Sequence, residues 1–216
     1  MKDNRGVVMN TIKNIFCIGR NYVEHVHELG NVVPEEPVVF TKPSHSLFMA
    51  DGQRLTLPSD EGDVHYEAEL VLKLGRDYEA GISVDDIVSE MTVGLDLTLR
   101  DVQSRLKEKG QPWLLAKGFT NAAVLGKFVP FTSEKDCEKK NFTLHINDEL
   151  VQEGDIKKMI FPLARQIEFL GEKLGLKKGD IIFTGTPEGV GPLREKDSLL
   201  LSWGDEALGK TQVSFK

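Results

Sequence analysis

Alternation of apolar and polar residues dominates this chain, and it predicts strands more often than helices. The longest example is VHYEAELVLKLG at 64–75, where Val64, Tyr66, Ala68 and Leu70 fall on one face of an extended chain. Other strands are predicted at 14–19, 37–43, 53–58, 93–99, 179–185, 197–203 and 211–215, and at FTLHI and LVQEG, which a hairpin turn at 147–148 joins.

Helical periodicity is confined to four segments. The clearest is 162–175, where Leu163, Ile167 and Leu170 share one face. The others are 20–30, with Asn21 at its N-cap position, 83–91 and 100–110. Because these helices do not alternate regularly with the more numerous strands, the pattern predicts a β-rich α+β fold instead of a doubly wound sheet.

Composition narrows the class of protein. At 216 residues and 40% hydrophobic content, without a linker or repeat, the chain is expected to form one domain over 1–216, with 1–13 as an N-terminal extension. A net charge of -7 with dispersed Lys and Arg argues against nucleic-acid binding. No apolar run approaches the roughly 20 residues of a membrane span, and no secretory signal is visible. With too few cysteines for a disulfide framework, we expect a soluble cytoplasmic protein.

Carboxylates interrupt two of the predicted strands. Glu67 and Glu69 lie two residues apart and therefore on one strand face. Their oxygens suit a hard divalent cation such as Mg²⁺. Asp96 in VGLDLTL is the candidate third ligand because aspartate is disfavoured within strands. Asp101 competes with it, although it is better placed as a helix cap. The alternative is a half-solvated strand whose outer face is polar.

Three residues that follow the third carboxylate in the chain could contact a substrate. If a helix starts near residue 98, Arg100 and Gln103 share roughly one face with Asp96, and this cation and amide suit a carboxylate-bearing substrate. Lys117 ends the apolar stretch in WLLAKGF, where a partly buried lysine can stabilise developing negative charge. The alternatives are an exposed helix face for Arg100 and Gln103, and a lysine that extends to water.

The helix at 20–30 carries a candidate general base. Glu28 lies one turn from His25 and can orient its ring and raise its basicity. The same i,i+3 pair also occurs on solvated helices, which is the alternative. The glycine-containing loop FTGTPEGVG at 183–191 matches neither phosphate-binding fingerprint, so nucleotide binding is not expected. A turn-rich loop that presents hydroxyl and N–H groups to a site is predicted instead.

Six motifs, taken in order, resemble the fumarylacetoacetate hydrolase family from about residue 14 to the C-terminus: CIGRNYVEHVHE, FTKPS, HYEAEL, LDLTLRDVQ, PWLLAKGF and GDIIFTGTPEGVGP. The pattern GRNY-x-x-H-x-x-E is most similar to the small acylpyruvase-like subgroup, which includes acylpyruvate hydrolases and oxaloacetate decarboxylases. The resemblance implies a mixed β-sandwich roll, a homodimer and a Mg²⁺ or Mn²⁺ ion. It implies the metal ligands Glu67, Glu69 and Asp96, the catalytic residues His25, Glu28 and Lys117, and the substrate-binding residues Arg100, Gln103 and Thr186.

The family's founding enzyme has a further aspartate ligand where this chain reads Phe16-Cys17-Ile18, so fumarylacetoacetate itself is not the expected substrate. The main hypothesis is hydrolysis of 3-acylpyruvates, such as acetylpyruvate or fumarylpyruvate, to pyruvate and a carboxylate. His25 would deprotonate the attacking water, while the metal and Lys117 would absorb the charge of the pyruvate enolate. Alternatives at the same site are oxaloacetate decarboxylation or tautomerisation and 2-hydroxyhepta-2,4-diene-1,7-dioate isomerisation. The non-enzymatic alternative is a binding protein stabilised by a cation.

Overall fold

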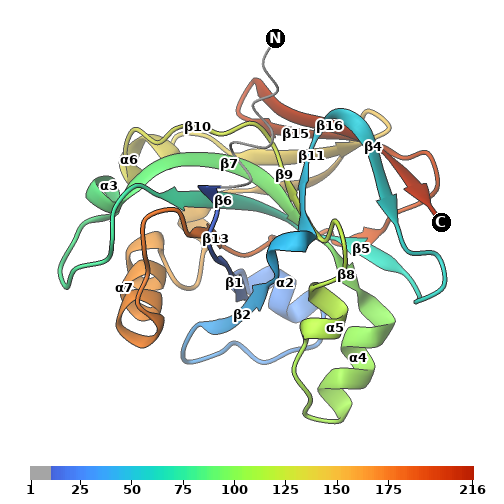
Figure 1. Cartoon of the computed structure of the whole chain (residues 1–216), viewed down its shortest axis with the longest axis horizontal. Coiled ribbons are helices and arrows are strands. Elements are labelled where there is room, and N and C mark those ends of the chain that lie inside the picture. The colour runs from blue at the N-terminus through green and yellow to red at the C-terminus, as the bar shows by residue number, and fades with distance from the viewer. Residues whose placement is uncertain (1–10) are drawn as a thin grey trace.

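The computed structural model describes residues 11–216, and its strands form three sheets (Figure 1). The largest sheet has the order β2-β1-β13-β6-β7-β9-β3, and β10 pairs with β7 outside this path. Its strands are β1 (Ile15–Gly19), β2 (Val38–Lys42), β3 (Leu47–Met49), β6 (Ala68–Leu74), β7 (Val88–Asp96), β9 (Ala123–Leu125), β10 (Val129–Pro130) and β13 (Ile181–Phe183).

The other two sheets complete the strand-rich body of the molecule. A five-stranded sheet has the order β12-β11-β15-β16-β4, and a three-stranded sheet has the order β14-β5-β8. The strands of the five-stranded sheet are β4 (Asp51–Leu57), β11 (Phe142–Ile146), β12 (Glu149–Gly154), β15 (Ser198–Trp203) and β16 (Glu206–Phe215). Those of the three-stranded sheet are β5 (Val64–Tyr66), β8 (Thr98–Leu99) and β14 (Gly191–Pro192).

Short helices lie around these sheets. They are α2 (Val23–Glu28), α3 (Val84–Ile87), α4 (Arg100–Glu108), α5 (Leu114–Lys117), α6 (Glu134–Cys137) and α7 (Leu163–Leu174), with the 3₁₀ turns η1 (Ser44–Ser46) and η2 (Ile156–Lys158). In Figure 1, α7 lies at one end of the molecule, while α4 and α5 lie side by side at the other. Among the helices of residues 11–216, none is long and apolar enough to cross a bilayer.

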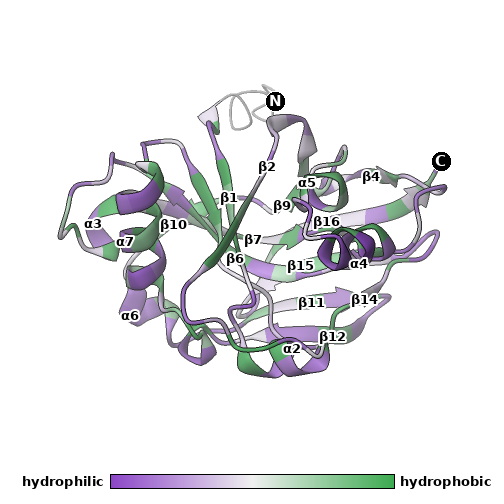
Figure 2. Ribbon diagram, turned by 90° about the horizontal axis from the view of Figure 1, so that it is seen from below, coloured by the Kyte–Doolittle hydropathy of each residue, from purple (hydrophilic) through white to green (hydrophobic). Residues whose placement is uncertain are grey.

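The predicted β-rich α+β fold is confirmed. Strand pairing is mixed, because β1–β13, β3–β9 and β4–β16 are parallel, whereas β6 pairs antiparallel with both β7 and β13. Figure 2 shows hydrophobic residues along β1, β6 and β7, and polar residues on the outer faces of α4 and α7. Every β6 residue except Lys73 is buried, so both faces of this strand are covered. The predicted alternative of a half-solvated strand is therefore wrong for β6.

Two local predictions fail for identifiable reasons. The helix expected over 83–91 ends at Ile87, because from Val88 onward the chain pairs with β6 and continues as β7. The predicted N-cap at Asn21 is also wrong, since α2 begins after Tyr22 without a side-chain cap. The Asn21 side chain instead donates to the carbonyls of Thr184 and Phe161 and accepts from the Phe161 N–H. It thereby joins the start of α2 to the loop that follows β13.

Candidate active site

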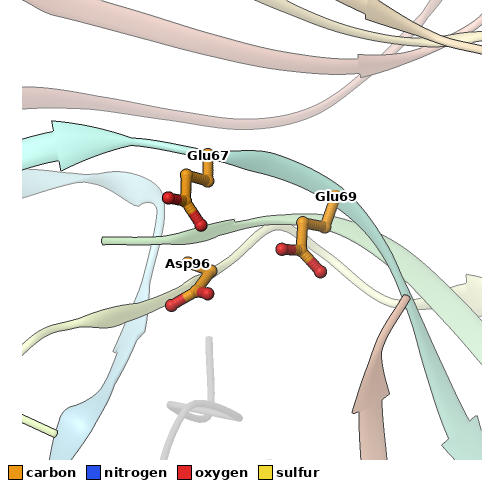
Figure 3. A group of neighbouring side chains, drawn as sticks. All are labelled: Glu67, Glu69 and Asp96. Atoms are coloured by element: carbon orange, nitrogen blue, oxygen red, sulfur yellow. The ribbon is translucent and has the colours of Figure 1, made fainter. Parts of the chain in front are cut away.

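Strand pairing brings the three predicted carboxylates together. Ala68 pairs with Leu95, so the preceding Glu67 lies opposite Asp96, whose N–H donates to the Glu67 carbonyl at 2.9 Å. Glu69 is two residues further along the same face. Ligand oxygens of Glu67, Glu69 and Asp96 all lie within 4.8 Å of one another, and Figure 3 shows the carboxylates pointing to the same side of the strands.

These acids are buried and almost surrounded by cations. Glu67, Glu69 and Asp96 expose only 5%, 2% and 1% of their surface. Lys117 Nζ lies 2.7 Å from Glu67 Oε2 and 2.6 Å from Asp96 Oδ2. Lys42 Nζ lies 2.6 Å from Asp96 Oδ1, and Arg100 Nη2 lies 2.5 Å from Glu67 Oε1. Two of the carboxylates are thus compensated by ion pairs, as buried charges require.

Glu69 is the carboxylate of the three that these ion pairs do not compensate, and its pKa reflects this difference. Burial, followed by the negative charges of Asp96 and Glu67, raises the pKa of Glu69 well above its ordinary value. Burial acts on Glu67 in the same sense, but Lys117 and Arg100 outweigh it and hold the pKa of Glu67 well below its ordinary value. Within residues 11–216, Glu69 has no ion-pair partner and accepts one backbone bond, from Gly185 N–H at 2.6 Å. A positive charge is therefore needed most at Glu69.

This arrangement fits a hard divalent cation. Three carboxylate oxygens are the donor set that Mg²⁺ and Mn²⁺ favour. The pocket that these acids help to line has a volume of about 30 Å³, which is room for an ion or a water molecule. Asp101, the competing ligand candidate, lies elsewhere: it is exposed in the first turn of α4 and accepts the Asp63 N–H at 3.2 Å. The residues present therefore match a metal centre in type, number and placement.

The predicted catalytic pair lies at the edge of the same pocket. His25 Nδ1 is 3.3 Å from Glu28 Oε2, and Glu28 Oε1 accepts the Gly189 N–H at 3.1 Å. Burial lowers the pKa of His25, although Glu67 and Glu28 act in the opposite direction. The imidazole is therefore neutral near pH 7, as a proton acceptor must be.

Eight of the nine predicted site residues line this single pocket. They are His25, Glu67, Glu69, Asp96, Arg100, Gln103, Lys117 and Thr186; Glu28 is not among the lining residues and reaches the site through His25. Arg100 Nη1 donates to Gln103 Oε1 at 2.7 Å, which fixes the two side chains relative to each other. The exposed-face alternative is wrong for Gln103, which is 4% exposed, and the solvent-reaching alternative is wrong for Lys117, which is 2% exposed.

Lys117 remains charged despite this burial. Burial alone would lower the pKa of Lys117, but Asp96 and Glu67 raise it above its ordinary value. Its ammonium group is therefore a fixed positive charge facing the pocket. Such a charge can stabilise an oxyanion that develops on a bound ligand.

Sequence reasoning missed two buried residues that build the site. Lys42, in FTKPS, is 3% exposed and reaches Asp96 from β2. Gln152, in β12, accepts the N–H of Ala68 at 2.8 Å and donates to Thr186 Oγ1 at 2.9 Å and to the Pro187 carbonyl at 3.0 Å. A lysine inside an apolar strand was a readable signal for Lys42, whereas nothing local distinguishes Gln152.

Comparison with known proteins agrees with the fold. Residues 14–211 match the family described as fumarylacetoacetate (FAA) hydrolase C-terminal. The chain therefore belongs to the fumarylacetoacetate hydrolase family, a family of enzymes, as its motifs predicted.

Individual relatives narrow the comparison. The chain is 41% identical over 189 residues to oxaloacetate tautomerase FAHD1 of Homo sapiens, which covers 87% of this chain and 85% of the relative. It is 39% identical over 202 residues to oxaloacetate tautomerase YcgM of Escherichia coli, covering 91% of each. A crystal structure of fumarylpyruvate hydrolase from Pseudomonas aeruginosa, in complex with Mn²⁺ and pyruvate, superimposes with a TM-score of 0.83 at 32% identity, over 94% of this chain and 89% of that one.

Proposed function

We propose that this chain is a metal-dependent enzyme that interconverts the enol and keto forms of oxaloacetate or a closely related 2-oxo dicarboxylic acid. The observation that carries the proposal is the 41% identity to an oxaloacetate tautomerase over 87% of the chain. The relatives thus favour oxaloacetate chemistry, which the sequence analysis gave as an alternative, over acylpyruvate hydrolysis, which was its main hypothesis. The pocket supports the proposal because it combines a cation-binding cluster, a neutral imidazole and fixed positive charges.

Glu67, Glu69 and Asp96 would hold the Mg²⁺ or Mn²⁺ ion. The bound ion would supply Lewis-acid stabilisation of negative charge on the substrate oxygens. Glu69 has to lose its proton to act as a ligand, because burial and its acidic neighbours raise its pKa in the protein without metal. Metal affinity should therefore rise with pH.

Tautomerisation moves one proton between carbon 3 and the oxygen on carbon 2. Because Glu28 accepts at His25 Nδ1, the proton of the neutral ring resides there and Nε2 is left as the base. In the keto-to-enol direction, Nε2 takes a proton from carbon 3, and the electron pair of that C–H bond forms the C2–C3 double bond of the enolate. Lys117 offsets the charge of the enolate oxygen. The His25 imidazolium then returns the proton to this oxygen, which gives the enol and restores the neutral ring.

The chelating end of the substrate requires positioning as well as charge. Arg100 and Gln103 are linked to each other and present a cation and an amide to the pocket. Thr186 adds a hydroxyl, and since Gln152 already donates to its oxygen, the Thr186 hydrogen is available for a substrate carboxylate. We propose that these three side chains bind the carboxylate next to the 2-oxo group.

Acylpyruvate hydrolysis remains the second candidate. The observation that favours it is the His25–Glu28 pair, which can activate a water as readily as it can accept a proton from carbon. The similar fumarylpyruvate hydrolase structure supports this candidate at the level of the family. In this reaction water attacks the distal carbonyl, the C–C bond breaks, and pyruvate enolate leaves.

The two candidates have different readouts. Purified protein with Mg²⁺ or Mn²⁺ is incubated with oxaloacetate, acetylpyruvate and fumarylpyruvate, while enol absorbance and pyruvate release are followed separately. We expect faster relaxation of oxaloacetate enol absorbance without pyruvate. Pyruvate release from an acylpyruvate would favour the hydrolase, and pyruvate release from oxaloacetate would favour decarboxylation. No metal-dependent turnover of any of the three would refute an enzyme of this class.

A further inference from the structure

Two cations in the pocket have no carboxylate partner within the described part of the chain. Arg100 and Lys117 are ion-paired to the metal-binding cluster, whereas Arg20 and Lys107 line the same pocket without any ion pair among residues 11–216. Arg20 Nε is buried and lacks a hydrogen-bond partner there. An unsatisfied buried donor of this kind is costly, so its presence beside a pocket points to a ligand.

Both cations lie against the same aromatic ring. The guanidinium carbon of Arg20 is 6.0 Å from the centre of the Trp113 ring, and Lys107 Nζ is 5.4 Å from it. The Trp113 ring also packs against Phe40, with centroids 5.6 Å apart. Trp113 thus holds two positive side chains near each other at the pocket. Burial, together with Arg20 and Arg100, lowers the pKa of Lys107 to about 8, as mutual repulsion of the cations requires.

The backbone at Arg20 strengthens this interpretation. Arg20 adopts φ of 59°, a left-handed conformation that favours glycine or asparagine and costs other residues about 1 kcal/mol or more. The backbone conformation at Arg20 therefore does not stabilise the fold and does not explain why an arginine occupies this position. Lys107 has a structural role of its own, because a cation in the last turn of α4 interacts favourably with the helix dipole. That role does not explain why Lys107 lines the pocket together with Arg20.

We propose that Arg20 and Lys107 form a subsite for the second carboxylate of a dicarboxylic 2-oxo acid. This proposal rests on the proposed function, in which the first carboxylate and the 2-oxo group occupy the metal end of the pocket. The distal carboxylate of oxaloacetate would accept charge-assisted hydrogen bonds from both side chains. Acetylpyruvate carries an acetyl group in the corresponding position and would leave the two cations unpaired. The subsite therefore determines which 2-oxo acid binds.

The test compares two inert ligands with the same four-carbon skeleton. L-Malate has a distal carboxylate, and (S)-2-hydroxybutyrate has a methyl group in its place. Binding to the Mn²⁺-loaded protein is measured by calorimetry for wild type, Arg20→Asn and Lys107→Met. Asparagine tolerates the left-handed backbone, and methionine keeps the length and helix propensity of the lysine. The matched control is Arg105→Gln, an exposed α4 residue outside the pocket.

We expect each subsite variant to lose about tenfold to a hundredfold in malate affinity, the range for hydrogen bonds to charged groups. Its affinity for 2-hydroxybutyrate should change less than threefold, and Arg105→Gln should match wild type for both ligands. Equal losses for the two ligands, or no loss of malate affinity, would overturn the subsite. The proposed function is assayed separately by oxaloacetate enol absorbance in wild type. A protein that discriminates the two ligands through Arg20 and Lys107 but does not accelerate tautomerisation would refute the function and retain the subsite.

Discussion

Replacing Glu69 by glutamine tests whether the carboxylate cluster is a metal centre. Glu69 lacks an ion pair within residues 11–216, and its main contact is the bond that Oε2 accepts from Gly185 N–H. A glutamine carbonyl oxygen can accept the same bond at nearly the same volume. The change Glu69→Gln therefore removes one negative charge and one metal ligand while leaving packing almost unchanged.

The effect on stability has opposite signs with and without metal. In metal-free protein, the raised pKa of Glu69 means that the folded state holds this proton more tightly than the unfolded state. Wild-type stability then falls as pH rises from the ordinary glutamate pKa through the raised one. Glutamine does not titrate, so the metal-free variant should equal or exceed wild type at pH 8, by a margin that shrinks toward pH 5.

In the presence of metal, the folded state of wild type should be stabilised more than that of Glu69→Gln. A ligand at 100 times its Kd stabilises the folded state by about 2.7 kcal/mol. For a chain of 216 residues, that corresponds to a rise in Tm of roughly 5–10 °C. The measurement is thermal unfolding by circular dichroism in EDTA and in Mn²⁺, at pH 5.5 and pH 8. Glu90→Gln is the control, because Glu90 pairs with Lys73 outside the pocket and its loss should preserve the Mn²⁺ shift. An equal Mn²⁺ shift in Glu69→Gln and wild type would refute the assignment.

Three further predictions concern residues around the cluster. His25→Gln should reduce kcat at least a hundredfold, as expected for loss of a general base, while the Mn²⁺-induced rise in Tm stays at the wild-type value. Gln152→Glu should raise KM about tenfold with a smaller change in kcat, because a carboxylate would draw the hydrogen of Thr186 away from the substrate; adding Thr186→Val should then have little further effect. Lys42→Met should cost about 3–5 kcal/mol in EDTA by leaving Asp96 undercompensated, and less in Mn²⁺, as urea unfolding would measure.

The sequence was most informative where the geometry of a strand determines which side chains share a face. Alternation alone places Glu67 and Glu69 on one face, and it identifies Asp96 as a polar residue in an apolar strand. The sequence does not reveal that β6 pairs with β7 in the register that puts Glu67 opposite Asp96. Nor does alternation reveal that both faces of β6 are covered, which is what buries the acids.

Contacts distant in sequence account for what was missed. Gln152 bonds to Ala68, 84 residues away, and nothing around Gln152 in the chain marks it as a site residue. Asn21 precedes a helix, where a cap is the usual role, yet its bonds go to Phe161 and Thr184. At 83–91 a helical turn forms with Ser83 at its N-cap, but pairing of the following residues with β6 outweighed further helix formation.

Charge distinguishes the two candidate substrates more sharply than the shared catalytic residues do. With Glu69 ionised as a metal ligand requires, Glu67, Glu69 and Asp96 bring three negative charges, and these balance the three positive charges of Lys42, Lys117 and Arg100. A divalent ion leaves a surplus of two positive charges, to which Arg20 and Lys107 add. A dianion such as oxaloacetate offsets this surplus better than a monoanion such as acetylpyruvate. A pocket with this charge balance should bind dicarboxylic 2-oxo acids more tightly, whichever bond its imidazole then acts on.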